Sequence, residues 1–318
     1  MNAFAVDIED IRAAARRIAP FAHRTPLATC ATLDRLAGRA LFLKCEQLQK
    51  AGAFKFRGAC NAVLRLSPET AARGVATHSS GNHAGALALA AKLRGIPAHV
   101  VMPRNASPVK RRAVEEYGGR VVECEPTLAA RETTVAAVIG ETSATLIPPY
   151  NHVDVIAGQG TTVLELLEQA PGLDALVMPV GGGGLMAGAT LAMKALAPNA
   201  RVFAAEPKGA DDAARSKAAG RLIPQTGPNT IADGLLTGLG DLTWPVLRDC
   251  VEGVVAVEDE EIVAAMRLAW ERAKLLIEPS AAVALAAVLS PEFRALRGMQ
   301  RVGILLSGGN VYLDALPW

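Results

Sequence analysis

The sequence predicts an α/β fold with two lobes, each built on an open, mostly parallel sheet flanked by helices. Three observations predict it. The chain has 318 residues, 51% of them hydrophobic, which suffices for two domains of ordinary size. Short apolar strands alternate with helices along most of the chain, as in parallel sheets. Glycine- and serine-rich turns follow several strands, and ligands bind at such strand ends, so we expect the functional site in the cleft between the lobes.

The first elements belong to the larger lobe. Residues 1–20 predict an amphipathic helix, because Asp7, Glu9 and Asp10 interrupt the apolar run that a signal peptide needs. The motif HRTP at residues 23–26 ends this helix. A short strand is expected at residues 40–47, and one helix at residues 63–74.

The middle of the chain predicts a small inserted α/β domain at residues 71–149, and residues 1–70 and 150–318 then form the large domain. In the small domain we expect strands at 74–77, 96–103 and 120–126 and helices at 85–95, 107–119 and 127–141. The rest of the large domain is expected to contain strands at 175–180, 201–207, 253–257 and 301–307 and helices at 157–169, 185–197, 259–276 and 281–289.

Composition excludes several classes of protein. A net charge of +2 and 4% aromatic residues provide no basic stripe or stacking platform, so nucleic acid is not an expected partner. No apolar run reaches the ~18 residues of a membrane span. The five cysteines are scattered and form no C-x-x-C pair, which predicts neither disulfides nor a thiolate metal site. We therefore expect a soluble protein of the cytoplasm.

Lys55 is the first candidate for chemistry. It lies between Phe54 and Phe56 in a turn rich in glycine and alanine. Loss of hydration in such an apolar setting lowers the pKa of an ammonium group, so that the neutral amine can attack a carbonyl near pH 7. A Schiff-base lysine is one interpretation. The alternative is a surface lysine that opens a helix.

A run of four glycines, Gly181 to Gly184, joins a buried strand to a helix. Its backbone N–H groups and the helix N-terminus favour a phosphate ligand. The run lacks the G-K-[ST] ending of a nucleoside triphosphate loop, so it suits a single terminal phosphate. The alternative is a tight turn that needs glycine for steric reasons.

Two further strand ends carry polar groups. In THSSGNH, residues 77–83, Ser79, Ser80 and Asn82 precede a helix and can bind a carboxylate there, although helix capping is the alternative. Ser307 follows the last strand, where its hydroxyl can meet the nitrogen of a heteroaromatic ring.

These motifs resemble a known superfamily. FKFRGA, THSSGNH, IAGQGT, the glycine run, TIADG, IEPS and LSGGN occur in the order seen in fold type II pyridoxal-phosphate enzymes. The resemblance covers essentially the whole chain and favours the serine racemase and serine/threonine dehydratase branch over the cysteine synthase branch. Because the chain stops soon after Ser307, we expect no regulatory domain like that of long threonine deaminases.

The resemblance implies a role for each motif. Lys55 would carry the cofactor, pyridoxal 5′-phosphate, as a Schiff base and act as a base on one face of the substrate Cα, with Ser80 on the opposite face. The implied cofactor contacts are Phe54, Lys55, Asn82, Gly181, Gly182, Gly183, Gly184, Gly234, Glu278 and Ser307. The implied substrate contacts are Ser79, Ser80, Asn82, His83, Arg131 and Thr237. A homodimer is implied as well.

A divalent cation, Mg²⁺, Mn²⁺ or Ca²⁺, is a second expected cofactor. Glu206, Asp212 and the carbonyl of Ala210 can present hard oxygen ligands, and the same positions are ligands in the serine racemase pattern. The alternative is a solvated acidic loop. Cys30 and Ala31 stand where ATP-binding serine racemases have small hydroxyl residues, which argues against activation by ATP, although Lys50 and Lys110 are retained.

The implied activity is an ammonia-lyase that converts L-serine and L-threonine to a 2-keto acid and ammonia and also racemises serine. Arg131 raises an alternative substrate, L-threo-3-hydroxyaspartate, because arginine can bind a second carboxylate in a bidentate manner. Alternatively, Arg131 is solvated and pairs with Glu132. A different class, a catalytically silent protein that binds a phosphate ligand, would leave Lys55, Ser80 and Ser307 without a joint purpose.

Overall fold

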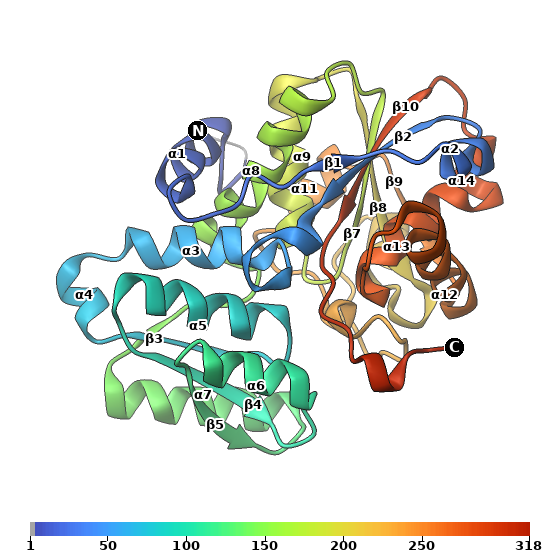
Figure 1. The fold of residues 1–318 in the computed structure, drawn as a ribbon. Helices are drawn as coiled ribbons and strands as arrows, with labels where there is room; N and C mark the ends of the chain where they lie inside the picture. Colours follow the sequence, from blue (N-terminus) through green and yellow to red (C-terminus); the bar gives the residue numbers. More distant parts are fainter. Residues whose placement is uncertain (1–3) are drawn as a thin grey trace.

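Two sheets contain the strands of residues 4–318, the part of the chain that the computed structural model describes (Figure 1). The larger sheet has the order β1-β2-β10-β7-β8-β9, and only β1 is antiparallel to its neighbour. Its strands are β1 (Leu27–Ala28), β2 (Ala40–Cys45), β7 (Ala175–Pro179), β8 (Arg201–Pro207), β9 (Gly253–Val257) and β10 (Arg301–Leu306). The predicted α/β fold with mostly parallel sheets is therefore confirmed.

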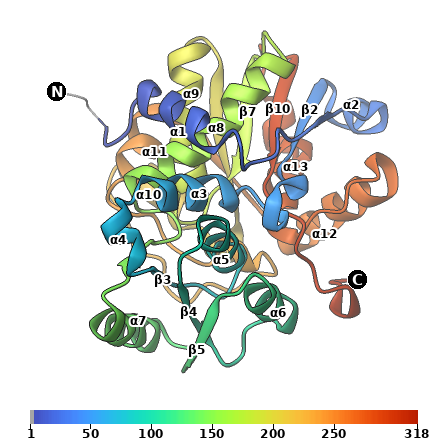
Figure 2. The ribbon, with the colours of Figure 1, turned by 60° about the vertical axis from the view of Figure 1, so that its left-hand side comes forward.

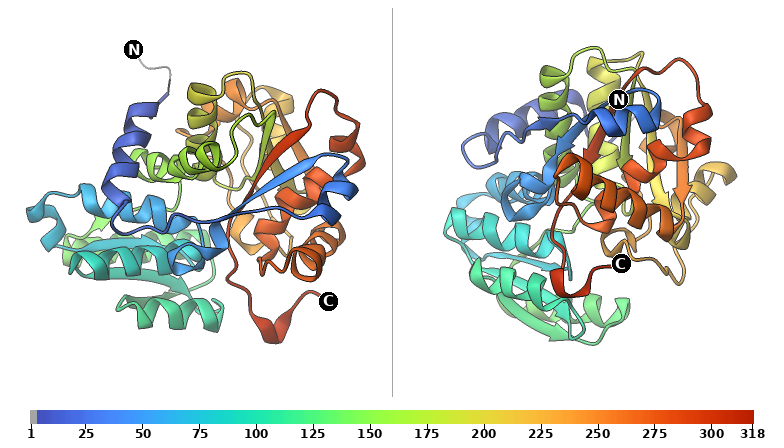
Figure 3. Two further views of the ribbon diagram at one scale, coloured as in Figure 1. Left: turned by 45° about the horizontal axis from the view of Figure 1, so that its top comes forward. Right: turned by 45° about the vertical axis from the view of Figure 1, so that its right-hand side comes forward.

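The smaller sheet is parallel throughout and has the order β5-β4-β3-β6. Its strands are β3 (Val75–His78), β4 (Ala98–Pro103), β5 (Arg120–Cys124) and β6 (Thr145–Leu146). Figure 3 shows this sheet and its helices beside the larger sheet. All four strands come from the segment predicted as a small domain, whereas the domain boundaries themselves stay a prediction.

Helices cover both faces of the larger sheet. One face packs α2, α12, α13 and Phe293 of α14, whereas the other packs α1, α8, α9 and α11. Successive residues of β7, Val177 and Met178, belong to these opposite faces, as the alternation of a strand requires. The helices are α1 (Ile8–Ile18), α2 (Ala31–Ala37), α3 (Lys55–Arg65), α4 (Pro68–Ala72), α5 (Asn82–Arg94), α6 (Pro108–Glu116), α7 (Leu128–Thr142), α8 (Val153–Gln169), α9 (Gly184–Leu196), α10 (Asp212–Ala219), α11 (Trp244–Cys250), α12 (Asp259–Leu268), α13 (Pro279–Leu289) and α14 (Pro291–Ala295).

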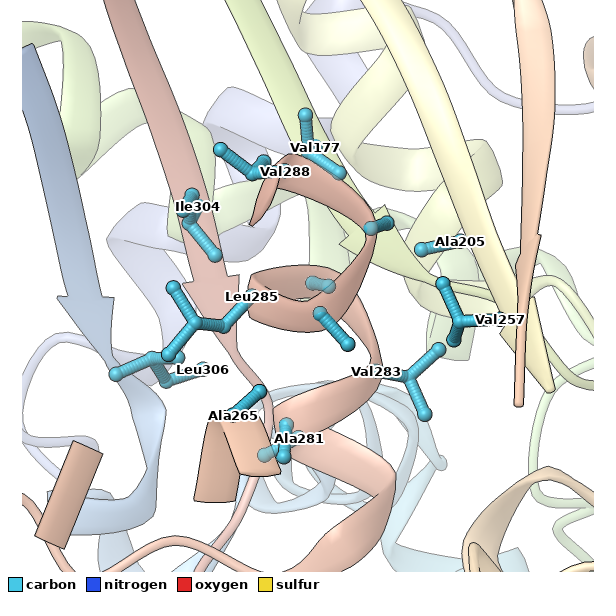
Figure 4. Close-up of a cluster of buried hydrophobic side chains, with 14 of the residues drawn as sticks. Val177, Ala205, Val257, Ala265, Ala281, Val283, Leu285, Val288, Ile304 and Leu306 are labelled. Carbon is cyan, nitrogen blue, oxygen red and sulfur yellow. The ribbon is translucent and has the colours of Figure 1, made fainter. Parts of the chain in front are cut away.

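Helix α13 is apolar on all sides because other elements surround it. Its alanines, its valines and Leu285 are buried, and Figure 4 shows Val283, Leu285 and Val288 among side chains of β7, β9 and β10. A helix that is hydrophobic all round belongs in the interior. This packing fixes the start of α13, where Glu278 and Ser280 reach the candidate site.

Glycines allow three helices to cross closely behind that site. A Cβ atom on Gly158 of α8 would lie 2.6 Å from the Cα of Gly58 in α3, and one on Gly188 of α9 would lie 2.7 Å from the nitrogen of Gly160 in α8. Only glycine permits such backbone approach. Figure 2 shows α3 between α8 and α5, so the helix that begins at Lys55 lies between elements of the two sheets.

Two predicted helices are wrong in extent. The helix expected at residues 63–74 is broken, since α3 ends at Arg65 and α4 begins at Pro68. Proline cannot donate to the preceding turn, and the Ser67 hydroxyl instead accepts a hydrogen bond from the Thr70 amide at 3.1 Å. The helix expected at 259–276 stops in a π-helical turn, and Lys274 adopts a left-handed backbone with φ of 59°.

The other long helices and strands lie where they are predicted, while the short helices α2, α10, α11 and α14 and strand β6 are not anticipated. The predicted N-terminal helix is present as α1, and residues 1–3 of that prediction lie outside the described residues. Within residues 4–318 no helix combines the length and the apolar character that crossing a membrane requires.

Candidate active site

Lys55 begins α3 at the carboxyl edge of the larger sheet. Its Nζ donates a hydrogen bond to the carbonyl of Pro149 at 2.8 Å and lies 5.1 Å from the centre of the Phe54 ring. Burial lowers the pKa of Lys55 to about 8, although the charge of Glu278 opposes this shift. Lys55 does open a helix, as the surface-lysine alternative requires, but its amine is buried and has lost hydration.

The end of β10 runs alongside this lysine. The Phe54 amide donates to the Ser307 carbonyl at 3.0 Å, and Ala53 forms an isolated β-bridge with Gly308. Ser307 is buried, with 3% of its surface exposed. This backbone pairing places Ser307 beside Phe54, the residue before Lys55, although the two are far apart in the sequence.

Asn82 and Glu278 form a hydrogen-bonded pair across the two sheets. The Asn82 amide donates to Glu278 Oε1 at 2.6 Å, and its oxygen accepts from Asn310 at 3.0 Å. Glu278 is 2% exposed, and its Oε2 has no hydrogen-bond partner among the described residues. Burial raises the pKa of Glu278 to about 7, and the charge of Lys110 opposes the shift. A ligand that brings a hydrogen-bond donor to Glu278 Oε2 would therefore be bound favourably.

The glycine run lies between β7 and α9. Gly183 has a left-handed backbone with φ of +85°, and a Cβ on it would lie 2.8 Å from Thr243. A Cβ on Gly182 would collide with the ring of Tyr150. The steric alternative therefore explains at least two of these glycines. The run also leads into the first turn of α9, whose N–H groups have no partner within the helix and suit an anion.

Pro149 and Tyr150 connect the lysine to the glycine run. Pro149 accepts from Lys55, and the ring of the next residue, Tyr150, packs against Gly182. The Tyr150 hydroxyl hydrogen-bonds the side chain of Thr237, and burial raises the pKa of Tyr150. The sequence alone does not point to either residue, because a Pro-Pro-Tyr segment before a helix indicates only a turn.

Around the start of α5, Ser79 forms a local turn and His83 is held by a backbone carbonyl. Ser79 accepts from the Gly81 amide at 3.3 Å in the turn before the helix, and Ser80 is half-buried in the same turn. Gly81 is the N-cap of α5 and no side chain caps it, so the capping alternative is wrong for these residues. His83 Nε2 lies 2.9 Å from the Ile147 carbonyl, which can only accept, so Nε2 carries the proton. Burial, followed by the charge of Lys55, lowers the pKa of His83 to about 3. His83 is therefore neutral, and its Nδ1 is a bare acceptor.

Arg131 lies on the first turns of α7, near the end of β3. Its Nε is buried without a hydrogen-bond partner among the described residues. Burial lowers the pKa of His78, the residue before Ser79. The charge of Glu132 opposes this shift and the charge of Arg131 adds to it, so both charged side chains of α7 act near the Ser79 turn. Gly234 is tied to α13, since its amide donates to Ser280 Oγ at 2.9 Å.

The predicted metal ligands are buried. Glu206, 0% exposed, accepts from the amides of Ala213 and Ala214 at 3.0 and 2.9 Å. Asp212 accepts from the Leu239 amide at 3.1 Å, and its Oδ1 has no partner among the described residues. Burial is the main reason that the pKa of Glu206 is raised to about 8 and that of Asp212 to about 6. The alternative of a solvated acidic loop is wrong for these two side chains.

A buried ionic cluster anchors α3 behind Lys55. Arg57, 1% exposed, donates to Glu46 at 2.8 Å and to Glu165 of α8 at 2.7 and 2.9 Å. Lys44 of β2 donates to Glu165 at 2.6 Å. Two cations thus meet two carboxylates. This cluster is not recognisable in the sequence, because its members lie up to 121 residues apart.

Comparison with known proteins gives a consistent picture. Residues 18–308 match the family described as pyridoxal-phosphate dependent enzyme. The chain is 55% identical to a serine racemase of Arabidopsis thaliana, over 98% of this chain and 96% of that protein. It is 52% identical to a β-hydroxyaspartate dehydratase of Paracoccus denitrificans (strain Pd 1222), over 98% of each.

Solved structures agree with these relatives. The structure of maize serine racemase superposes with a TM-score of 0.97 at 52% identity, covering 98% of this chain and 95% of that one. The crystal structure of a threonine deaminase superposes with a TM-score of 0.92 at 45% identity, covering 97% of this chain and 100% of that one.

Proposed function

The chain belongs to the family of pyridoxal-phosphate-dependent enzymes, and we propose that it converts L-serine and L-threonine to 2-keto acids and ammonia and also racemises serine. The observation that carries this proposal is the Lys55 amine, with its pKa of about 8, joined through Pro149 and Tyr150 to the glycine run. An amine that can lose its proton near pH 8 and backbone N–H groups that suit a phosphate would thus belong to one site.

The residues present fit pyridoxal 5′-phosphate. Lys55 would hold its aldehyde, the glycine run its phosphate, Asn82 its ring hydroxyl and Ser307 its ring nitrogen, while the unpartnered oxygen of Glu278 leaves room for a further donor. When bound, this cofactor withdraws electrons from the substrate Cα, which makes the Cα proton acidic. Ser307, a neutral hydroxyl, would hold the ring nitrogen without protonating it, which would limit this withdrawal and favour loss of the β-substituent over transamination.

The side chains then divide the proton transfers. Lys55 Nζ accepts the Cα proton on one face, because burial makes its neutral form accessible near pH 7. Ser80 Oγ can return a proton to the opposite face, which inverts the configuration. If the β-hydroxyl leaves first, the product hydrolyses to the keto acid and ammonia. The carboxylate of the substrate would meet the Ser79 turn and the start of α5.

The purified holoenzyme should release ammonia and keto acid from L-serine and L-threonine and form D-serine from L-serine. Ser80→Ala is expected to lower the rate of D-serine formation by about 10²-fold or more, because one face of Cα loses its proton donor. Chiral chromatography measures this rate, and L-serine dehydration in the same samples is the reference. Unchanged D-serine formation would remove Ser80 from the mechanism, whereas wild type without any turnover would favour the silent binding protein.

A second substrate, L-threo-3-hydroxyaspartate, is favoured by the unpartnered Nε of Arg131 and by the named activity of the Paracoccus relative. We expect Arg131→Ala to lower kcat/KM for hydroxyaspartate about 10- to 100-fold, since a charge-assisted hydrogen bond is lost, and to leave L-serine nearly unaffected. Oxaloacetate and pyruvate formation measure the two values. Arg112→Ala, an exposed arginine of α6, is the matched control. An unchanged substrate preference would rule out Arg131 as the selector.

The lowered pKa of Lys55 predicts how the apoenzyme reloads with its cofactor. Only the neutral amine attacks the aldehyde, so the reloading rate should rise with pH and level off above about pH 8, the pKa of Lys55. Absorbance of the bound cofactor follows the reaction, and a simple alkylamine with an ordinary pKa is the reference. If the rate with apoenzyme kept rising to pH 10, as the alkylamine should, the lysine would not be desolvated.

A divalent cation is proposed at Glu206, Asp212 and the Ala210 carbonyl. The support is the unpartnered Oδ1 of Asp212 together with the buried carboxylate of Glu206. Mg²⁺, Mn²⁺ and Ca²⁺ prefer such hard oxygen ligands. Among the described residues no cluster of three His, Cys, Asp or Glu side chains forms, so carbonyl oxygen or water must complete the ligand set. The homodimer, the cytoplasmic location and the lack of activation by ATP stay predictions.

A further inference from the structure

A basic pocket lies at the edge of the larger sheet opposite the candidate active site. It has a volume of about 460 Å³ and is formed by the end of α2, by α14 and by the segment that leads into β10. Figure 1 shows α2 and α14 near the ends at which β2 and β10 begin. Lys55 and Ser307 lie beyond the other ends of these six-residue strands, about 20 Å away. The pocket is thus separate from the site described above.

The described residues that line this pocket include three arginines, Arg39, Arg294 and Arg297, and no carboxylate. Arg39 is only 9% exposed, so it holds a fixed charge in the wall, whereas Arg294 and Arg297 are exposed and can move toward an occupant. Three like charges around one cavity repel each other, and a compensating anion relieves that repulsion.

Arg39 is only partly satisfied by protein. Its Nη2 donates to the carbonyls of Arg294 and Leu296, both at 3.2 Å, while Nε and Nη1 are buried without partners among the described residues. Burial, followed by the charges of Arg201, Arg294 and Arg297, lowers the pKa of Arg39, and no carboxylate contributes to that shift. A buried donor without an acceptor is costly, so this wall favours negative charge beside it.

The nearby carboxylates are committed to other groups. Asp34 accepts from the Leu41 amide at 2.9 Å, and Asp174 accepts from the amides of Gln300 and Arg301 at 2.7 and 2.8 Å. Glu252 pairs with Arg201 at 2.5 Å, which neutralises the fourth arginine of this edge. Glu292 of α14 does not line the pocket and does not contribute to the pKa shift of Arg39. The three arginines that line the pocket therefore keep their charge available.

We propose that this pocket binds a small multivalent oxyanion, a metabolite that carries phosphate or several carboxylates, through Arg39, Arg294 and Arg297. Arginine suits this class because its planar guanidinium binds phosphate and carboxylate in a bidentate manner. The volume falls in the range of metabolite pockets, so the occupant can be larger than a single phosphate ion.

Calorimetry on the holoenzyme tests the proposal. Full loading with cofactor keeps the probe away from the glycine run. Inorganic phosphate, pyrophosphate and citrate are titrated at constant ionic strength, with chloride as the reference. We expect saturable binding to wild type, and binding at least about tenfold weaker to the double variant Arg294→Ala/Arg297→Ala. Tighter binding of pyrophosphate indicates a phosphorylated metabolite, and tighter binding of citrate a polycarboxylate.

The double variant Arg12→Ala/Arg16→Ala on α1 removes two exposed positive charges elsewhere and should bind like wild type. Arg39→Lys keeps the charge in the wall but loses the planar fork, so binding should be weaker than in wild type. Equal binding by wild type and Arg294→Ala/Arg297→Ala, or a response no different from that to chloride, would overturn the proposal. Unfolding temperatures of all variants show whether each one is folded.

Discussion

Lys55→Ala is expected to reduce turnover of L-serine by about 10³-fold or more and to abolish the absorbance of covalently held cofactor. The variant loses both the amine that holds the aldehyde and the base that accepts the Cα proton. Its fold should persist, because the Lys55 side chain donates a hydrogen bond to the Pro149 carbonyl alone among the described residues and lies at the start of α3. Keto acid formation and visible absorbance of the purified protein measure the two effects.

Lys92→Ala is the matched control for this variant. Lys92 is an exposed lysine of α5 that donates to the Glu116 carbonyl at 3.1 Å, so it also loses one contact to a carbonyl, but far from the glycine run. It should keep the activity and absorbance of wild type. Substantial turnover or an unchanged absorbance band in Lys55→Ala would show that another group holds the cofactor, and the central assignment would fail.

Arg57→Met is expected to lower the free energy of unfolding by about 3–5 kcal/mol, the largest stability effect that we predict. Removal of the guanidinium leaves Glu46 fully buried and Glu165 partly buried with only Lys44 as a remaining cation. The neighbouring Lys55 should be displaced as well, because α3 loses its anchor to α8. Urea-induced unfolding measures the change.

The sign of the pH dependence follows from Glu165. Burial opposes ionisation of Glu165, but Arg57 and Lys44 lower its pKa below the ordinary value of 4.5. Its pairing therefore stabilises the fold above about pH 4.5 and is lost as the pH falls further. The difference in stability between wild type and Arg57→Met should shrink in that acidic range. Arg12→Ala, which breaks an exposed pair with Glu9, should cost at most about 1 kcal/mol and is the control. A loss of similar size in both variants would contradict the role of the cluster.

Much of the fold follows from local sequence. Alternating strands and helices predict parallel sheets, and the long elements lie where their periodicity places them. The errors occur where local chemistry competes with periodicity. Pro68 breaks a helix that apolar spacing alone would continue, and Lys274 ends another in a left-handed conformation. The short helices α2, α10 and α11 have too few turns to show a period.

The candidate site is predicted in part. Lys55, Ser307 and the glycine run are recognisable because each combines an unusual residue pattern with the end of a strand. Pro149 and Tyr150 are not, because their importance is a contact: Pro149 lies 94 residues from the lysine that it accepts from. For the same reason the basic pocket around Arg39 could not be foreseen, since its arginines come from segments more than 250 residues apart.

By itself, the sequence determined the class of fold, the family and the identity of the reactive groups, because these depend on residue types and spacing along the chain. Only the tertiary structure decided which groups are desolvated and which charges meet. The pKa of about 8 for Lys55 and the burial of Glu206 and Asp212 follow from what surrounds each group in space. Desolvation and Coulomb interactions depend on distance through the fold, and distance along the chain does not report it.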